Sequence, residues 1–127
     1  MNLSIPVAAT PDAWAELDRP SVLAASLPGC RSAEPADGGG FRLVVDVAVA
    51  SVRGLWAGTV TETDAGGWRV VGSGEPGRVD LILRVDPDHT TVTVEGTVEG
   101  PLAAIGSKLL AAAVRRLVQE TLARAER

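Results

Sequence analysis

The stretch SVLAASLPGC, residues 21–30, shows where a short apolar helix must end. Pro28 has no amide hydrogen to donate and Gly29 readily adopts positive φ, so the chain leaves this helix as a strand or an extended loop. Another short helix is expected just before it, because Thr10 can cap a helix whose first position is Pro11. The sequence therefore predicts two short helices in succession near the N-terminus.

Alternating apolar and polar residues predict β-strands on both sides of these helices. Residues 2–7 alternate before them, and most of residues 41–99 alternates after them, with glycine-rich turns such as residues 64–67 between the runs. Residues 91–99 give the clearest signal, because valine or glycine alternates there with threonine or glutamate. This pattern predicts a meander of six or seven antiparallel strands.

From Pro101 onward the apolar residues recur with helical rather than strand periodicity. About 25 residues at a rise of 1.5 Å each would form a helix of about 38 Å, long enough to cross a whole sheet. Strands followed by one long C-terminal helix define the α+β class. A length of 127 residues suits a single domain spanning residues 1–127.

Charge and composition exclude several classes of function. Residues 1–100 contain 7 Lys and Arg against 14 Asp and Glu, so the body of the protein lacks the basic surface that nucleic-acid binding needs. The single cysteine rules out an internal disulfide and a cysteine-based zinc cluster, and no metal or cofactor ligand set is visible. No apolar run approaches the roughly 20 residues that span a bilayer, and no export signal precedes the first strand. The sequence thus predicts a cytoplasmic protein without cofactors.

Two local features invite a chemical interpretation that their surroundings do not support. Cys30 would need a neighbouring base to act as a nucleophile, and the only histidine, His89, lies in an expected turn. The glycine-rich segment 72–77 lacks the Lys-Ser/Thr pair and the following helix of a phosphate loop. Its glycines are better suited to bending strands, or to forming a flexible rim above a cavity.

Five segments together resemble the family of the carbon monoxide dehydrogenase G subunit, a branch of the START-like helix-grip superfamily (also called SRPBCC or polyketide cyclase-like). They occur in the family's order and comprise residues 3–7, 10–17, 23–30, 52–60 and 102–110. The fourth segment contains the run Gly-Leu-Trp-Ala-Gly-Thr-Val, and the fifth contains a Gly-Ser pair. The resemblance implies a curved antiparallel sheet around the long C-terminal helix, with an apolar cavity between them.

The same resemblance implies a protein that binds a small molecule rather than transforming it. The ligand would be apolar or amphipathic, such as a lipid or a quinone-like compound. The protein would be accessory to a molybdenum-containing carbon monoxide dehydrogenase-like oxidoreductase, in maturation, membrane recruitment or electron-carrier handling, and subunits of that enzyme would be its partners. The inward-facing residues expected to line the cavity are Val45, Val47, Trp56, Val60, Leu81, Leu83, Val94, Ile105 and Leu109.

Two alternatives stay open. An enzyme of the cyclase, dehydratase or hydrolase type would use polar groups inside the same cavity. Inward-pointing side chains at Asp46, Asp80, Arg84 or Glu95 would favour it. A protein-interaction module would instead have a filled and inert interior.

The C-terminal segment carries most of the basic charge. Residues 101–127 contain 5 Lys and Arg against 2 Glu, which could attract an anionic membrane surface. The apolar face of the expected helix should already be engaged with the sheet. Contact with a membrane is therefore expected to be peripheral and weak.

Overall fold

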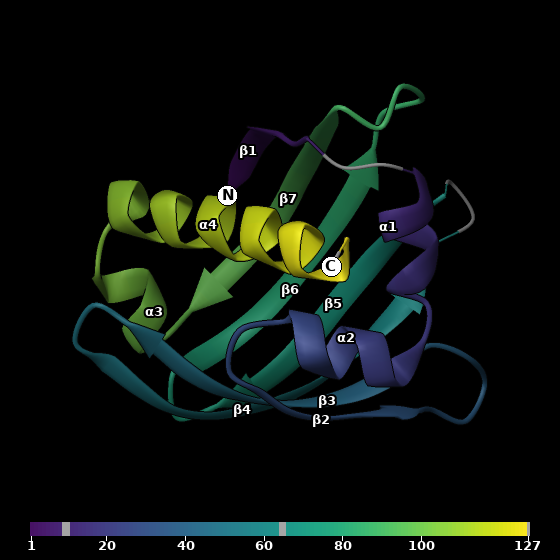
Figure 1. The fold of residues 1–127 in the computed structure, drawn as a ribbon. Helices are drawn as coiled ribbons and strands as arrows, with labels where there is room; N and C mark the ends of the chain where they lie inside the picture. The colour runs from purple at the N-terminus through teal and green to yellow at the C-terminus, as the bar shows by residue number, and fades with distance from the viewer. Residues whose placement is uncertain (9–10, 64–65, 127) are drawn as a thin grey trace.

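The structure, a computed structural model, describes residues 1–8, 11–63 and 66–126 and confirms the α+β class. One antiparallel sheet of seven strands curves around the last helix, as the resemblance implies (Figure 1). The strand order is β1-β7-β6-β5-β4-β3-β2, so the first strand pairs with the last. The strands are β1 (Asn2–Pro6), β2 (Cys30–Pro35), β3 (Phe41–Val49), β4 (Val52–Glu62), β5 (Gly67–Gly74), β6 (Gly77–Val85) and β7 (Thr91–Glu99).

Two short helices, α1 (Pro11–Glu16) and α2 (Pro20–Ser26), follow β1 as the sequence predicts. α2 ends where Leu27 takes an extended conformation, with φ −76° and ψ 117°, and the following proline prevents its continuation. Gly29 then turns the chain at φ 79°, where a Cβ atom would overlap the carbonyl oxygen of Asp46. The Pro-Gly pair therefore leads the chain directly into β2, at the edge of the sheet beside β3.

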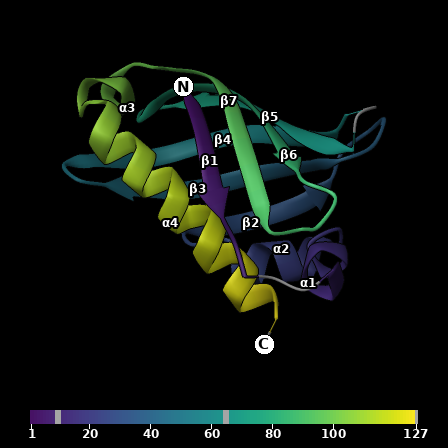
Figure 2. The same ribbon diagram turned by 90° about the horizontal axis from the view of Figure 1, so that it is seen from above.

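The C-terminal helix is shorter than the sequence predicts, because it is broken into α3 (Pro101–Ala104) and α4 (Ser107–Ala125). The break lies at Gly106, whose φ of 97° and ψ of 154° fall in a backbone region that is essentially restricted to glycine. The 19 residues of α4 span about 28 Å at the helical rise of 1.5 Å per residue. Figure 2 shows α4 crossing the sheet diagonally, with α3 as a separate turn beyond its N-terminal end.

α4 is fixed to the sheet mainly along one side. Ile5, Val92 and Val94 of β1 and β7 are fully buried, and Val114 and Val118 of α4 pack against them. This buried cluster draws its strand residues from β1, β6 and β7. α1 and α2 both contact α4, and α2 also contacts β2 (Figure 1). The buried cluster therefore does not include the concave face of β3, β4 and β5, which faces the helices.

Replacing Gly106 by alanine should destabilise the protein by about 1–3 kcal/mol, the usual cost of a non-glycine residue in this backbone region. An added Cβ would meet no atom within 4 Å, so the loss reports backbone strain alone. Urea unfolding measures the effect, and Ser107→Ala is the control because Ser107 is exposed in the first turn of α4. A neutral or stabilising Gly106→Ala variant would contradict the need for a break and favour one continuous helix.

Candidate ligand cavity

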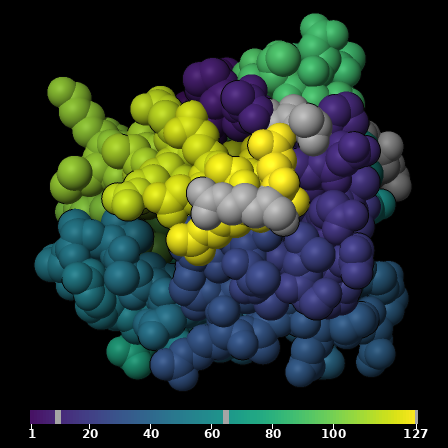
Figure 3. Space-filling model, viewed as in Figure 1, coloured from purple at the N-terminus to yellow at the C-terminus, as the bar shows by residue number. Residues whose placement is uncertain are grey.

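A cavity of about 340 Å³ lies between the concave face of the sheet and the helices. Among the described residues its lining is apolar except for Asp18 and Thr121. The hydroxyl of Thr121 donates to the carbonyl oxygen of Leu117 at 2.7 Å and is thus engaged within α4. Figure 3 shows α1, α2 and α4 covering this side of the molecule. Leu117 lines the cavity yet is 39% exposed, so the cavity reaches the surface beside it.

Strand alternation supplies most of the lining, because every second side chain of a strand points to the same face. β3 contributes all its odd-numbered residues, Phe41, Leu43, Val45, Val47 and Val49. Cross-strand pairing continues these rows, since Val45 lies opposite Trp56 and Phe41 lies opposite Val60. The sequence pattern therefore predicts which face of the sheet lines the cavity.

Trp56 lies in the middle of this face because two glycines leave room for its ring. Gly58 and Gly72 are paired across β4 and β5, and a Cβ atom on either would overlap the six-membered ring of the indole, at Cη2 and Cζ2 respectively. Trp56 is 6% exposed as a result. The two glycines thus determine how closely this ring lies against the sheet.

All four aromatic residues of the chain line the cavity. Trp14 of α1 and Trp68 of β5 stack with ring centroids 5.6 Å apart and planes 12° apart, a favourable arrangement for aromatic rings. Phe41 and Trp56 are the other two. The buried indole Nε1 atoms of Trp14 and Trp56 have no hydrogen-bond partner in the described parts of the chain. The few aromatic side chains of this protein thus all lie in the cavity lining, among aliphatic side chains.

Seven of the nine residues expected to line the cavity do so, whereas Ile105 and Leu109 do not. The seven are Val45, Val47, Trp56, Val60, Leu81, Leu83 and Val94. Leu109 is 55% exposed. The expectation for Leu109 assumed a single helix from Pro101. The helix is instead interrupted at Gly106, and α4 presents other residues, such as Leu110, to the cavity. Contact of any lining residue with a ligand stays a prediction.

The two short helices supply lining residues that the strand pattern could not indicate. Trp14 of α1 and Leu23 of α2 line the cavity, as do Leu17 and Asp18 just after α1 and Leu27 just after α2. For Trp14 and Leu17 the sequence signal was their spacing on one helical face. It could not show which part of the sheet that face would cover, because the contact is made between segments far apart in the chain.

The charged strand residues that would have favoured catalysis do not line the cavity. Asp46, Asp80, Arg84 and Glu95 alternate with lining residues and therefore belong to the opposite, convex face. Asp80 pairs with Arg69 at 2.9 Å, and Arg84 pairs with Glu95 at 3.2 Å. The Arg69 guanidinium lowers the pKa of Asp80. These groups therefore lie on the exposed face, away from the cavity lining.

The two local features that invite a chemical interpretation have structural roles. Burial raises the pKa of the Cys30 thiol, whereas an activated nucleophile needs a lowered pKa. Its Sγ donates to the carbonyl oxygen of Ser32 at 3.3 Å. Residues 72–77 form the β5–β6 hairpin, in which Pro76 is fully buried and its carbonyl oxygen accepts a hydrogen bond from Leu102 N at 2.9 Å. This hairpin thus contacts α3, and none of its residues 72–77 lines the cavity.

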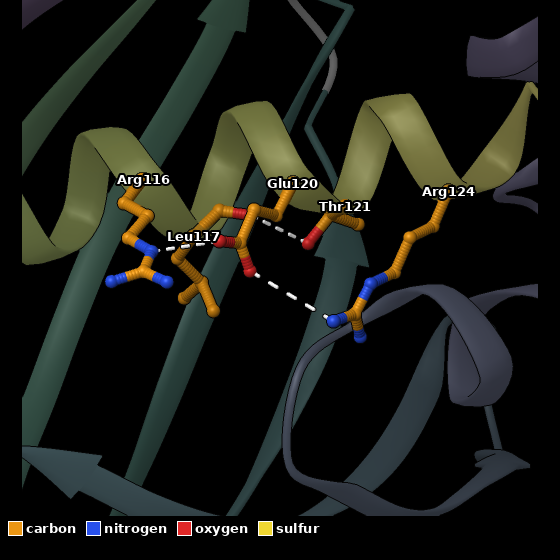
Figure 4. Close-up of polar contacts among 5 residues, drawn as sticks. All are labelled: Arg116, Leu117, Glu120, Thr121 and Arg124. Carbon is orange, nitrogen blue, oxygen red and sulfur yellow. Dashed lines mark hydrogen bonds and ion pairs between the residues drawn. The ribbon is translucent and has the colours of Figure 1, made fainter.

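A chain of ion pairs runs along α4 next to Leu117 (Figure 4). Arg116 Nε lies 2.7 Å from Oε1 of Glu120, and a guanidinium nitrogen of Arg124 lies 3.9 Å from Oε2. The hydrogen bond from Arg116 lowers the pKa of Glu120. Both arginines are thus held by one carboxylate, and neither lines the cavity.

A curved antiparallel sheet that grips a helix, with an apolar cavity between them, defines the helix-grip class of the START-like superfamily. The sequence pattern of the CoxG family, named for the G subunit of carbon monoxide dehydrogenase, matches residues 4–126 of the chain. The chain belongs to this family, which confirms the resemblance of the five sequence segments.

Two solved structures share the fold. A conserved protein from Geobacillus kaustophilus has a TM-score of 0.79 at 23% identity, covering 98% of this chain and 90% of that chain. A hypothetical protein from Sulfolobus tokodaii has a TM-score of 0.54 at 15% identity, covering 97% of this chain and 93% of that chain. At these identities the likeness concerns the fold alone. No curated protein matches the chain.

Two features are absent from residues 1–8, 11–63 and 66–126, a membrane-spanning helix and a cluster of metal ligands. None of the helices there combines the length and the hydropathy needed to cross a bilayer. No group of three or more His, Cys, Asp or Glu side chains there is placed to hold a metal ion.

Replacing Gly72 by alanine should displace Trp56 and destabilise the protein by about 1–3 kcal/mol, the usual cost of overpacking an interior. Urea unfolding followed by tryptophan emission measures both the loss and the displacement. Ser73→Ala is the matched control, because Ser73 is the next residue of β5 and is exposed. Equal stability of the two variants would show that the glycine is not needed for the ring.

The Cys30 thiol should ionise at higher pH in the folded protein than in the unfolded chain, because burial raises its pKa. The rate of alkylation by iodoacetamide, measured against pH, should therefore rise later in native protein than in urea. A native midpoint equal to or below the unfolded one would contradict this assignment.

Proposed function

We propose that this protein binds an apolar or amphipathic small molecule, a lipid or a quinone-like compound, without transforming it. The observation that carries the proposal is the cavity of about 340 Å³ with its almost wholly apolar lining. This volume falls within the range of small-molecule sites, roughly 300–1,000 Å³. Water is poorly held by such walls, because a buried water needs two to four polar partners. An apolar chain or ring is the occupant that these side chains favour.

The chemistry of the lining supports binding over catalysis. A cyclase, dehydratase or hydrolase needs polar groups that converge on the reacting atoms. The described lining offers one carboxylate, Asp18, and one hydroxyl, on Thr121, which already donates within its own helix. The aliphatic and aromatic walls supply contact area and no groups for proton transfer.

The family supports a role beside an oxidoreductase. Its description as the G subunit of carbon monoxide dehydrogenase is the basis for an accessory protein that serves a molybdenum-containing enzyme of that type. Maturation, membrane recruitment and electron-carrier handling each suit a protein that holds an apolar molecule apart from water. In this proposal residues 1–127 act as one cytoplasmic domain, and contact with a membrane is peripheral and weak.

Native mass spectrometry of protein purified without detergent tests the binding function. The proposal expects a reproducible additional mass that organic solvent extracts. Ala113→Phe should abolish it, because Ala113 lines the cavity and a phenyl ring there would occupy the space. Ala112→Phe is the matched control, because Ala112 is the neighbouring residue and is exposed. Protein that carries no such mass and takes up no hydrophobic probe would overturn the proposal.

A further inference from the structure

The cavity is long and narrow. β3 lines it from Phe41 to Val49, which is about 26 Å of strand at roughly 3.3 Å per residue. α4 lines it from Leu110 to Leu122, which is about 18 Å of helix at roughly 1.5 Å per residue. A sphere with the volume of the cavity, about 340 Å³, has a diameter of about 9 Å. The space between the two walls therefore extends along them, and its cross-section is small.

Trp56 lies midway along this space. It is paired with Val45, the middle one of the five β3 residues in the lining. Three glycines adjoin Trp56 on the same face of the sheet. Gly58 is two residues further along β4, and Gly72 is paired with Gly58. Gly74 is paired with Trp56 itself. Because these glycines have no side chains, the indole ring is the group that covers this part of the concave face.

Neighbouring groups cannot take the place of this ring. Trp56 is 6% exposed, so a smaller side chain at this position leaves empty volume inside the protein. Such a volume persists where the surroundings do not collapse into it. Collapse is opposed here, because β4 is paired with β3 on one side and with β5 on the other, and the adjoining positions are glycines. The ring thus limits the girth of a molecule at the middle of the cavity.

We infer that the ligand is an amphiphile with a slender hydrocarbon chain, and that Trp56 selects it by its girth. This inference rests on the proposed function and narrows it. A chain that lies along β3 and α4 contacts apolar walls over its whole length, and each buried methylene adds to its affinity. A bulky polycyclic body with the same number of carbon atoms meets the indole ring, and overpacking of an interior is unfavourable.

Two probes with equal numbers of carbon atoms and one hydroxyl each test this inference, the linear 1-decanol and the cage-shaped 1-adamantanol. Calorimetry gives their affinities for the protein. Each affinity is corrected for the partition of the probe from water into octanol, so that the remaining difference reports fit and not hydrophobicity. The wild-type protein should then bind decanol about tenfold more tightly than adamantanol, a difference that a misfit of one methylene produces in an apolar pocket.

Substitutions of Trp56 assign this preference to its ring. Trp56→Val should reduce the ratio of decanol affinity to adamantanol affinity about tenfold, because the vacated space admits the cage. Trp56→Phe removes less volume and should give an intermediate ratio, in protein shown to be folded by circular dichroism. Leu55→Val is the matched control, because Leu55 is the preceding residue of β4, is 45% exposed and lies outside the lining. It should keep the wild-type ratio.

The outcomes distinguish this inference from the function beneath it. Equal corrected affinities of the wild-type protein for the two alcohols overturn the slender ligand and leave the apolar carrier standing. Folded Trp56 variants that keep the wild-type ratio overturn the selection by Trp56. Failure of both alcohols to bind, in protein that also carries no extractable mass, overturns the inference and the proposed function together.

Discussion

The contact between α4 and the β1–β7 side of the sheet is the interaction on which the rest of the structure depends. Val114 and Val118 pack there against the buried Val92 and Val94, and full burial of such side chains contributes about 1.5–3 kcal/mol each. This contact holds the helix above the sheet without drawing it onto β3, β4 and β5. The side chains of those strands do not fill the remaining space, and a cavity of about 340 Å³ is the result.

The same strands carry two different electrostatic surfaces. Val79 and Leu81 line the cavity, and Asp80 between them pairs with Arg69 at 2.9 Å on the other face. Strand alternation separates the two sets, so the ion pairs lie on the convex face and the apolar side chains line the concave face. The cavity lining is therefore almost wholly apolar in a protein whose charged residues outnumber its aromatic ones several-fold.

The strand part of the fold and of the cavity could be predicted from the sequence, and the helical part only in outline. Side chains of a β-strand alternate between its two faces. This alternation places Val45, Trp56 and Val94 on the concave face, whatever contacts the strands make with distant parts of the chain. Leu109 lies outside the cavity lining, because a single glycine, Gly106, interrupts a helical pattern that is otherwise continuous in the sequence. Leu23 could not be assigned to the lining from the sequence, because its place there depends on how α2 docks against α4 at the other end of the chain.

The ring of Trp56 lies against Gly58 and Gly72 and lines the cavity. The size of this one side chain therefore limits the space at this point of the cavity, in addition to the path of the backbone. Exchanging that ring for a smaller side chain would enlarge the interior and leave the curvature of the sheet as it is. The volume of the interior can thus change through a single position in one strand.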